Sequence, residues 1–313
     1  LVLTLALPIT LRRAYNDTGA YLNNFLSAPT LIELLSEDLL HLLRNPLFQV
    51  YEALIRTFTD NYMVFFMFPA FFVQYSYARF IRKHSPSLVV GVTLYLFLGT
   101  YSFSIAAMKQ SLAMAVLLYA VDALIERKYV RFFLLVFIAF LFHTYAIAFL
   151  ILPLFTTKPW TGRTILLLAV VYFVMRNFNP LIESFLEFTN ENGKNVSAEE
   201  IIGTAAINPT RVAVYAVTPL LALVFRRYLI QNGEDREHNI LINMSVLTVA
   251  IMSIGLISGA NMFARMGQYF EFGLLCSLPW ILKRTFEPRS AWVMTSVALL
   301  CFLGYFCYAN LVQ

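Results

Sequence analysis

The sequence predicts an all-α polytopic membrane protein. Its 313 residues have a mean hydropathy of +0.69; 59% are apolar and only 13% are charged. Soluble domains usually carry about a quarter charged residues. The apolar residues form many separate stretches of roughly 15 to 21 residues, a length suited to membrane-crossing helices, which also satisfy their own backbone in lipid. We therefore expect about 9–10 transmembrane helices in a single integral membrane domain covering residues 1–313.

The expected crossings can be assigned along the chain. Residues 1–11 are too few to cross a bilayer, so we interpret them as the outer half of a first span. The other expected crossings are 61–80, 88–101, 109–125, 164–178, 211–228, 240–257, 262–282 and 291–308. Pro69, Pro219 and Pro279 lie inside three of them and should kink those helices, which membrane bundles tolerate.

Residues 130–155 leave two interpretations open. As one helix this segment would be about 39 Å long, too long for an upright crossing and too short for two. One interpretation is a single, long, tilted helix. The other is a re-entrant hairpin with His143 at its tip, which gives every proposed cytoplasmic loop at least two Lys or Arg residues, as the positive-inside rule expects.

Two long polar stretches, 12–60 and 179–210, become extracytoplasmic loops in that topology. Within the first, 31–43 and 47–58 have apolar residues at helical spacing and are expected to lie along the membrane surface. Lys109 and Arg265 fall on the same outer side.

The first candidate site residues are Arg12, Arg13, Asp17 and Tyr21, just past the first span. Two guanidinium groups can clamp a pyrophosphate, and a nearby carboxylate can orient them or accept a proton from a hydroxyl. The alternative is a solvated cluster at the membrane interface.

Lys109 is expected at the outer start of its helix, followed by Gln110. A lysine there commonly extends to the lipid headgroups. A cation is unfavourable at a helix N-terminus, however, so an anionic partner is an equal alternative.

A polar stripe is expected near the C-terminus, in NMFARMGQYFEFGLLCSLPW. Arg265 is followed by Gln268 and Tyr269 at a spacing that shares one helix face. Glu271 is expected on a different face, paired with a basic neighbour. Asp122, beside a basic loop, is interpreted as an ordinary charge at a loop edge.

His143 interrupts a long apolar run. It titrates near physiological pH, so it could donate to a phosphate or carry a proton. A lone His in an apolar helix is more often a hydrogen-bonded packing residue, and this alternative stays open.

Other classes of site are not indicated. HExxH, GxSxG, Walker and GxGxxG patterns are absent, and no cofactor or metal is expected. Cys276, Cys301 and Cys307 lie without a CxxC in late apolar segments and are interpreted as packing residues. The net charge of +5 comes from dispersed Lys and Arg, which indicates membrane topology and anionic lipid contact rather than nucleic-acid binding.

Three stretches together resemble the EpsG family of Wzy-type polysaccharide polymerases. They are RRAYNDTGAY, MKQSLAMAV with FHTYAIAFLILP some 30 residues later, and FARMGQYFEFGLLCSLP. The order and membrane placement match over nearly the whole chain. Two positions depart from the family pattern: Lys109 stands where an Arg is usual, and Asn16 where a Gly precedes Asp17. Lysine keeps the charge but loses the bidentate fork.

The resemblance implies a metal-independent glycosyltransferase with a GT-C-type membrane bundle. It would act on the outer face of the bacterial cytoplasmic membrane, transferring a growing glycan from undecaprenyl pyrophosphate to a lipid-linked repeat unit. A chain-length regulator protein is a possible partner. Two alternatives are an O-antigen ligase-like glycosyltransferase and a transporter or flippase of lipid-linked oligosaccharide; internal repeats, common in transporters, are not found.

The resemblance also suggests roles for the candidate residues. Preorganised cations would stabilise the departing pyrophosphate, and a base would deprotonate the acceptor hydroxyl. The clamp would consist of Arg13, Lys109 and Arg265, supported by Arg12 and Arg211. Asp17 is the first candidate base and His143 the second, and sugar contacts would come from Tyr21, Gln110, Gln268 and Tyr269.

Overall fold

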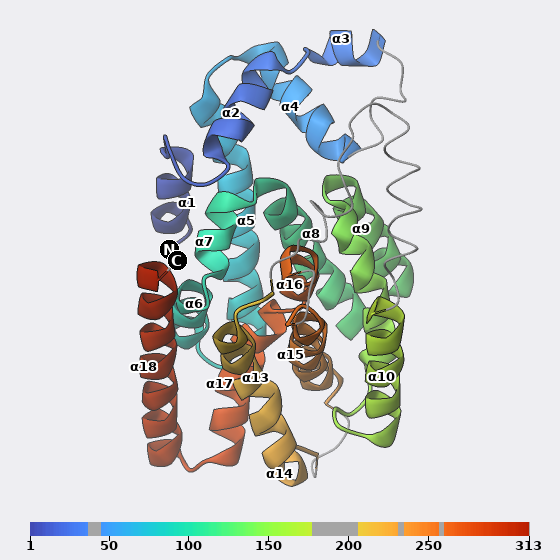
Figure 1. The fold of residues 1–313 in the computed structure, drawn as a ribbon, viewed down its shortest axis with the longest axis vertical. Helices are drawn as coiled ribbons and strands as arrows, with labels where there is room; N and C mark the ends of the chain where they lie inside the picture. Colours follow the sequence, from blue (N-terminus) through green and yellow to red (C-terminus); the bar gives the residue numbers. More distant parts are fainter. Residues whose placement is uncertain (37–44, 177–205, 231–234, 257–259, 313) are drawn as a thin grey trace. The chain divides into compact units, whose positions relative to one another are not determined.

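The computed structural model describes residues 1–36, 45–176, 206–230, 235–256 and 260–312 (Figure 1). The chain forms two compact units. Unit 1 comprises Leu1–Lys83 and Gly99–Ile147, and unit 2 comprises His84–Leu98 and Ala148–Gln313. Both units contain apolar helices, and the single integral membrane domain stays a prediction.

Unit 1 is built on two long helices, α5 (Tyr62–His84) and α8 (Met108–Ile125). Nearly every side chain of α8 is buried, and α9 (Tyr129–Phe142) packs along it. The shorter helices of this unit are α1 (Val2–Thr10), α2 (Thr18–Ser27), α3 (Leu31–Ser36), α4 (Pro46–Phe58) and α7 (Thr100–Ala106). Figure 1 shows α2, α3 and α4 beyond the N-terminal end of α5.

The helix predicted at 47–58 is confirmed as α4. Asn45 precedes it at a positive φ of 56°, and Pro46 occupies the first turn, where its missing N–H is not needed. The buried face of α4 holds one charged residue, Glu52, among apolar ones. The helix predicted at 31–43 is confirmed in part by α3, and residues 37–43 lie outside the described residues.

Unit 2 is organised around α15 (Arg236–Ile254), which packs against α13 (Pro209–Val224), α16 (Ala260–Gln268) and α17 (Phe272–Thr285). The side chain of Asp235 caps α15 by accepting from the His238 N–H. The remaining helices of this unit are α6 (Leu88–Phe97), α10 (Gly162–Arg176), α14 (Arg226–Ile230) and α18 (Pro288–Val312).

The predicted class, an all-α polytopic membrane protein, is confirmed. Within the described residues four helices are long and apolar enough to cross a membrane, or five if α6 and α7 form one span broken at Gly99. The four are Tyr62–His84, Met108–Ile125, Arg236–Ile254 and Pro288–Leu311. Four shorter apolar helices accompany them, at Tyr129–Phe142, Thr144–Phe155, Gly162–Val174 and Pro209–Val224. The chain stays helical through Pro69, Pro219 and Pro279.

The segment predicted to cross at 262–282 is not one continuous helix, and its crossing stays a prediction. α16 ends at Gln268 and α17 begins at Phe272. Between them, the N–H groups of residues 269–271 donate to carbonyls three residues back, at 3.3, 3.0 and 3.2 Å. This tighter winding keeps those N–H groups satisfied where the α-helix is interrupted.

The alternative of one long helix over 130–155 is wrong. α9 ends at Phe142, His143 is extended with φ −156° and ψ 121°, and a 3-10 helix follows over Thr144–Phe155. The break falls at the residue predicted for the hairpin tip. The return of the second arm to the cytoplasmic side stays a prediction. The predicted loop 179–210 lies outside the described residues up to residue 205.

Candidate functional site

Arg12 and Arg13 are adjacent but lie in opposite environments. Arg13 is exposed, whereas only 8% of Arg12 is accessible and its guanidinium carbon lies 4.1 Å from the centre of the Phe66 ring. Burial lowers the pKa of Arg12 to about 10, partly offset by Tyr21. Arg12 therefore stays charged at neutral pH. Among the described residues, its Nε and Nη2 atoms have no hydrogen-bond acceptor.

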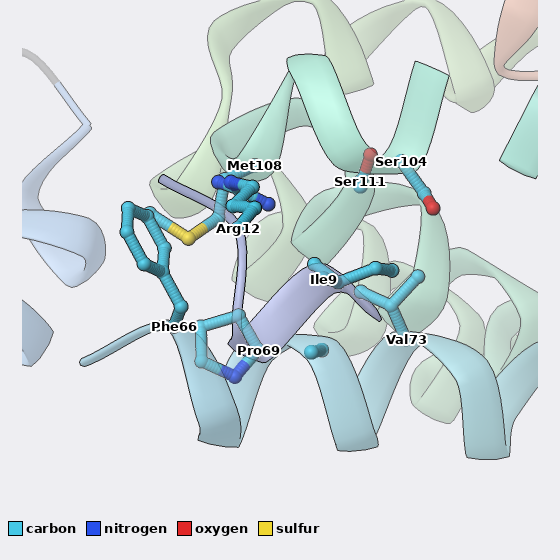
Figure 2. Close-up of a pocket in the computed structure, with 9 residues that line it drawn as sticks. Ile9, Arg12, Phe66, Pro69, Val73, Ser104, Met108 and Ser111 are labelled. Carbon is cyan, nitrogen blue, oxygen red and sulfur yellow. The ribbon is translucent and has the colours of Figure 1, made fainter. Parts of the chain in front are cut away.

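A narrow pocket adjoins Arg12 within unit 1 (Figure 2). Its wall is mostly apolar, and Ser104 and Ser111 add hydroxyl groups. The hydroxyl of Ser111 is buried and accepts or donates no hydrogen bond within the described part of the chain. The other lining residues are Ile9, Phe66, Pro69, Ala70, Val73 and Met108. A buried cation with unused N–H groups beside hydroxyls is suited to an anionic oxygen.

The structure brings Lys109 together with Tyr21, a contact that the sequence did not predict. The backbone N–H of Lys109 donates to the Tyr21 hydroxyl at 3.5 Å. The ring of Tyr21 meets Phe48 edge to face, with centroids 6.0 Å apart. Lys109 Nζ lies 4.7 Å from the centre of the same Phe48 ring, a cation–π contact. The lysine thus turns toward α2 and α4.

Glu52 is the anionic neighbour of Lys109, and sequence reasoning missed it. Only 7% of Glu52 is accessible, and burial raises the pKa of its carboxyl to about 7 while the charge of Lys109 lowers it. Its Oε1 atom has no hydrogen bond to any described residue. A single carboxylate four residues after Phe48, on the apolar face of a surface helix, is the sequence signal that could have identified it. We call Arg12, Tyr21, Phe48, Glu52 and Lys109 the Lys109 cluster.

Asp17 and His143, the predicted bases, are less enclosed. Asp17 precedes α2 as its N-cap, is exposed, and makes no capping bond through its side chain. His143 is half-buried at the end of α9, with its ring edge to face with Tyr145 at 5.2 Å. Gln110, a predicted sugar contact, is buried on α8.

A second polar group lies in unit 2, and we call Arg211, Tyr215 and Glu271 the Glu271 cluster. The Tyr215 hydroxyl lies 3.0 Å from Glu271 Oε2 and 3.1 Å from the carbonyl oxygen of Leu98. The Arg211 guanidinium lies 5.8 Å from the Tyr215 ring centre and interacts electrostatically with Glu271. The expectation that Glu271 pairs with a basic neighbour agrees with this arrangement.

The predicted polar stripe is shorter than expected. Arg265 is half-buried and Gln268 buried, both on α16. Tyr269 is fully buried beyond the end of that helix, so it does not share the α16 face. Gly267 lets α16 pack closely on α15, since a Cβ there would lie 2.8 Å from Met252 Cγ.

Among the described residues, His, Cys, Asp and Glu side chains do not form a group of three or more that could hold a metal ion. The comparisons with known proteins give one result. A family model for the EpsG family matches residues 1–313.

The chain belongs to the EpsG family. Membership makes it a multi-pass membrane protein of the polysaccharide-polymerase type. Neither a curated protein nor a solved structure matches the chain.

One departure from the EpsG pattern has a backbone explanation. Asn16, which stands where a Gly is usual, has a φ of 42°. This left-handed conformation is open to glycine and, among residues with a side chain, is best tolerated by Asn and Asp. Asn16 is therefore suited to the turn that places Asp17 at the start of α2.

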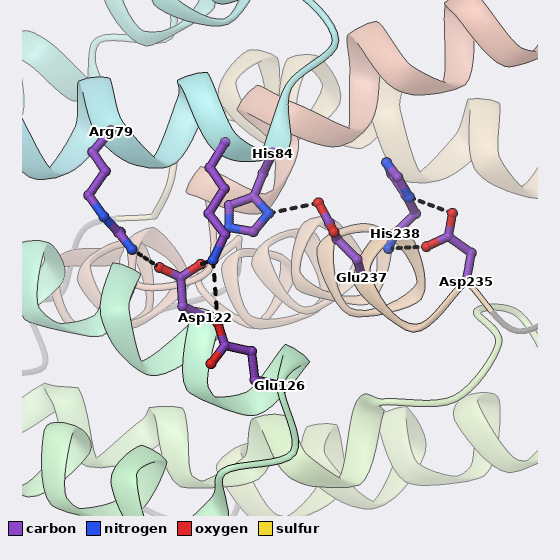
Figure 3. A network of polar contacts seen from close by, with 8 residues as sticks. Arg79, His84, Asp122, Glu126, Asp235, Glu237 and His238 are labelled. Atoms are coloured by element: carbon purple, nitrogen blue, oxygen red, sulfur yellow. Dashed lines mark hydrogen bonds and ion pairs between the residues drawn. The ribbon is translucent and has the colours of Figure 1, made fainter.

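In this EpsG protein Asp122 is not an ordinary loop-edge charge, and that interpretation is wrong. It is 5% exposed and forms ion pairs with Arg79 and, at 2.7 Å, with Lys83, both on α5 (Figure 3). A carboxylate buried at one end of α8 is thus neutralised by the neighbouring helix. In unit 2, His84 Nδ1 contacts Glu237 at 2.7 Å.

Proposed function

We propose that this EpsG protein is a polysaccharide polymerase of the bacterial cytoplasmic membrane, active on its outer face. It transfers a growing glycan from undecaprenyl pyrophosphate to a sugar hydroxyl of a lipid-linked repeat unit. Bound membrane lipid and a chain-length regulator are its proposed partners, and the transfer is proposed to need no metal.

The reaction forms one bond and breaks another. The acceptor oxygen attacks the anomeric carbon of the donor, the bond from that carbon to pyrophosphate oxygen breaks, and the acceptor hydroxyl loses its proton. Negative charge grows on the departing undecaprenyl pyrophosphate. Cations already fixed at that position lower the barrier, because they need not reorganise during the reaction.

Arg12 is the observation that carries this proposal. A guanidinium that is buried, charged and short of hydrogen-bond acceptors is costly unless an anion joins it. Pyrophosphate oxygens are suitable acceptors, and Lys109 lies in the same cluster through their shared neighbour Tyr21. We therefore propose Arg12 as a principal phosphate ligand rather than a supporting residue of the clamp.

The other proposed ligands differ in how they are held. Arg13 is exposed and able to reach a headgroup, and Arg265 is half-buried on α16. Arg211 already faces Glu271 and Tyr215. We therefore propose that Arg211 orients Glu271 and Tyr215 within unit 2.

The polymerase proposal is tested with purified protein and lipid-linked repeat units as the only substrates. A polymerase yields a ladder of products of increasing length. A ligase requires a separate acceptor lipid, and a flippase moves the substrate across the bilayer without forming a glycosidic bond. If folded protein supplied with its cognate repeat unit yields no ladder, the polymerase proposal is contradicted.

The role of Arg12 is tested in the same assay by Arg12→Ala and Arg12→Lys. We expect the alanine variant to lose about 100-fold or more in rate, as when a preorganised charge partner is removed. The lysine variant should recover only part, because it lacks the planar fork. Arg82→Ala is the matched control, since Arg82 is an exposed arginine of α5.

A further inference from the structure

We propose that Glu52 accepts the proton of the acceptor hydroxyl, with Lys109 coupling this step to departure of the pyrophosphate. The assignment rests on the proposed polymerase function and replaces Asp17 and His143 as the base. It joins a buried carboxylate of α4 to the cation at the start of α8.

The position of Glu52 is unusual for a surface helix. The neighbours of Glu52 on the buried face of α4 are Phe48, Ala53 and Ile55, all apolar. A carboxylate is placed among such residues at a cost in free energy unless it has a partner. Its Oε1 atom, buried and without a hydrogen bond in the described residues, is open to a donor such as a sugar hydroxyl.

The electrostatic surroundings of Glu52 are simple. Burial and the charge of Lys109 set its pKa, which lies near 7. On its own helix, Tyr51 donates to the Phe65 carbonyl, and Arg56 pairs with Asp60. Elements packed against α4 carry further titratable groups: Tyr21 on α2, Glu33 on α3, Tyr62 at the start of α5, and Tyr129, Arg131 and His143 with α9.

A carboxylate with a pKa near neutrality binds a proton more tightly than an ordinary one, and about half of it is still ionised at neutral pH. Asp17, in contrast, is exposed to water, where solvent competes with a hydroxyl for its oxygens. Enclosure therefore favours Glu52 over Asp17.

Lys109 connects the two halves of the reaction. In the unliganded protein its charge acts on Glu52 and lowers that residue's proton affinity. When charge builds on pyrophosphate oxygen, Lys109 is shared with the phosphate, and the proton affinity of Glu52 rises. The O–H proton passes to Glu52 as the new oxygen–carbon bond forms, the old carbon–oxygen bond breaks, and undecaprenyl pyrophosphate leaves with the electron pair. Glu52 then returns the proton to water.

The alternative is that Glu52 and Lys109 are only a buried structural pair. The test compares wild type with Glu52→Gln, Glu52→Asp and Asp17→Asn, using full-length protein and lipid-linked repeat units. Rates are measured between about pH 5 and pH 9, together with the affinity for undecaprenyl pyrophosphate, the leaving group of the reaction.

The proposal predicts how kcat, its pH dependence and the binding affinity change together in these variants. Wild-type kcat should rise with pH, with the midpoint of the rise near 7, because the deprotonated carboxylate is the active form. Glu52→Gln should lower kcat by about 100-fold to 10,000-fold and abolish that rise, with the affinity for undecaprenyl pyrophosphate changed less than about threefold. Glu52→Asp should keep the rise at reduced kcat, because the carboxylate remains but is one methylene shorter. Asp17→Asn should keep the wild-type kcat and its rise with pH.

Two results overturn the assignment without touching the polymerase function: Glu52→Gln that retains kcat and the pH-dependent rise, or Asp17→Asn that alone removes them. If Glu52→Gln does not fold, Glu52→Asp decides, and loss of its pH-dependent rise counts against the proposal. If folded wild type makes no glycosidic bond with its cognate substrate, the polymerase function fails and the role of Glu52 fails with it.

Discussion

The hydroxyl of Tyr51 donates a hydrogen bond to the backbone carbonyl of Phe65. That carbonyl lies four residues before Pro69, which has no N–H to give it. A side chain of α4 thus supplies the bond that the proline removes from α5. The same bond fixes α4, the helix that carries Glu52, against α5 within unit 1.

Tyr51→Phe is therefore expected to destabilise unit 1. The substitution leaves the Phe65 carbonyl without its donor, at a cost of about 1–3 kcal/mol. Thermal unfolding of the detergent-solubilised protein measures the effect. Tyr75→Phe, at an exposed residue of α5, is the control and should leave the midpoint unchanged. Equal midpoints for the two variants would show that the bond contributes nothing.

Glu52 is expected to make stability depend on pH. Its folded-state pKa, about 7, is raised above the ordinary value of 4.5, so the folded protein binds the proton more tightly than the unfolded chain does. This contribution is full below about pH 4.5 and is lost as the pH rises through 7, at a cost of up to about 3 kcal/mol. Midpoints measured against pH should fall for wild type relative to Glu52→Gln over that interval. Parallel curves would contradict the raised pKa.

Arg12 and Arg13 should contribute unequally to lipid-pyrophosphate binding. Arg12 is buried without hydrogen-bond acceptors in the described residues, whereas Arg13 is already solvated. We expect Arg12→Ala to weaken affinity for undecaprenyl pyrophosphate by about 10-fold to 100-fold, and Arg13→Ala by several-fold at most. Titration calorimetry measures both, with undecaprenol as the uncharged control. A larger effect at Arg13 would reverse the assignment.

Asp122→Asn should destabilise the protein by about 1–3 kcal/mol, because it leaves Arg79 and Lys83 without their shared carboxylate. The partial exposure of both cations keeps the expected cost at the lower end for a buried pair. Glu126→Gln, which removes a more exposed carboxylate of the same helix end, should change stability by less than about 0.5 kcal/mol. Denaturant unfolding distinguishes the two variants.

Gly273→Ala tests the close packing of α17 on α15. A Cβ at Gly273 would lie 2.6 Å from the backbone oxygen of Leu241, and backbone cannot move aside cheaply. We expect a loss of about 1–3 kcal/mol. Gly304→Ala on α18 is the matched control, since its Cβ would meet nothing within 4 Å. If both alanine variants unfold at the wild-type midpoint, the two helices do not pack as described.

Composition and apolar length were enough to predict the membrane class, and helical spacing was enough to predict α4. The same spacing could not identify Glu52 as a site residue, because its neighbour Lys109 belongs to a helix 57 positions later in the chain and only folding brings them together. Asp122 was misread for a related reason: the nearest cations in sequence, Arg127 and Lys128, are not the Arg79 and Lys83 that pair with it.

The interruption between α16 and α17 also changes which way the following residues face. An α-helix advances about 100° per residue and a 3-10 helix about 120°, so three tightly wound residues rotate the rest of the chain by about 60°. A helical wheel drawn from Arg265 is therefore out of phase beyond Gln268. The rotation offsets two halves of one apolar segment: α16 carries Arg265, and the turn after it places the Glu271 carboxylate 3.0 Å from the Tyr215 hydroxyl.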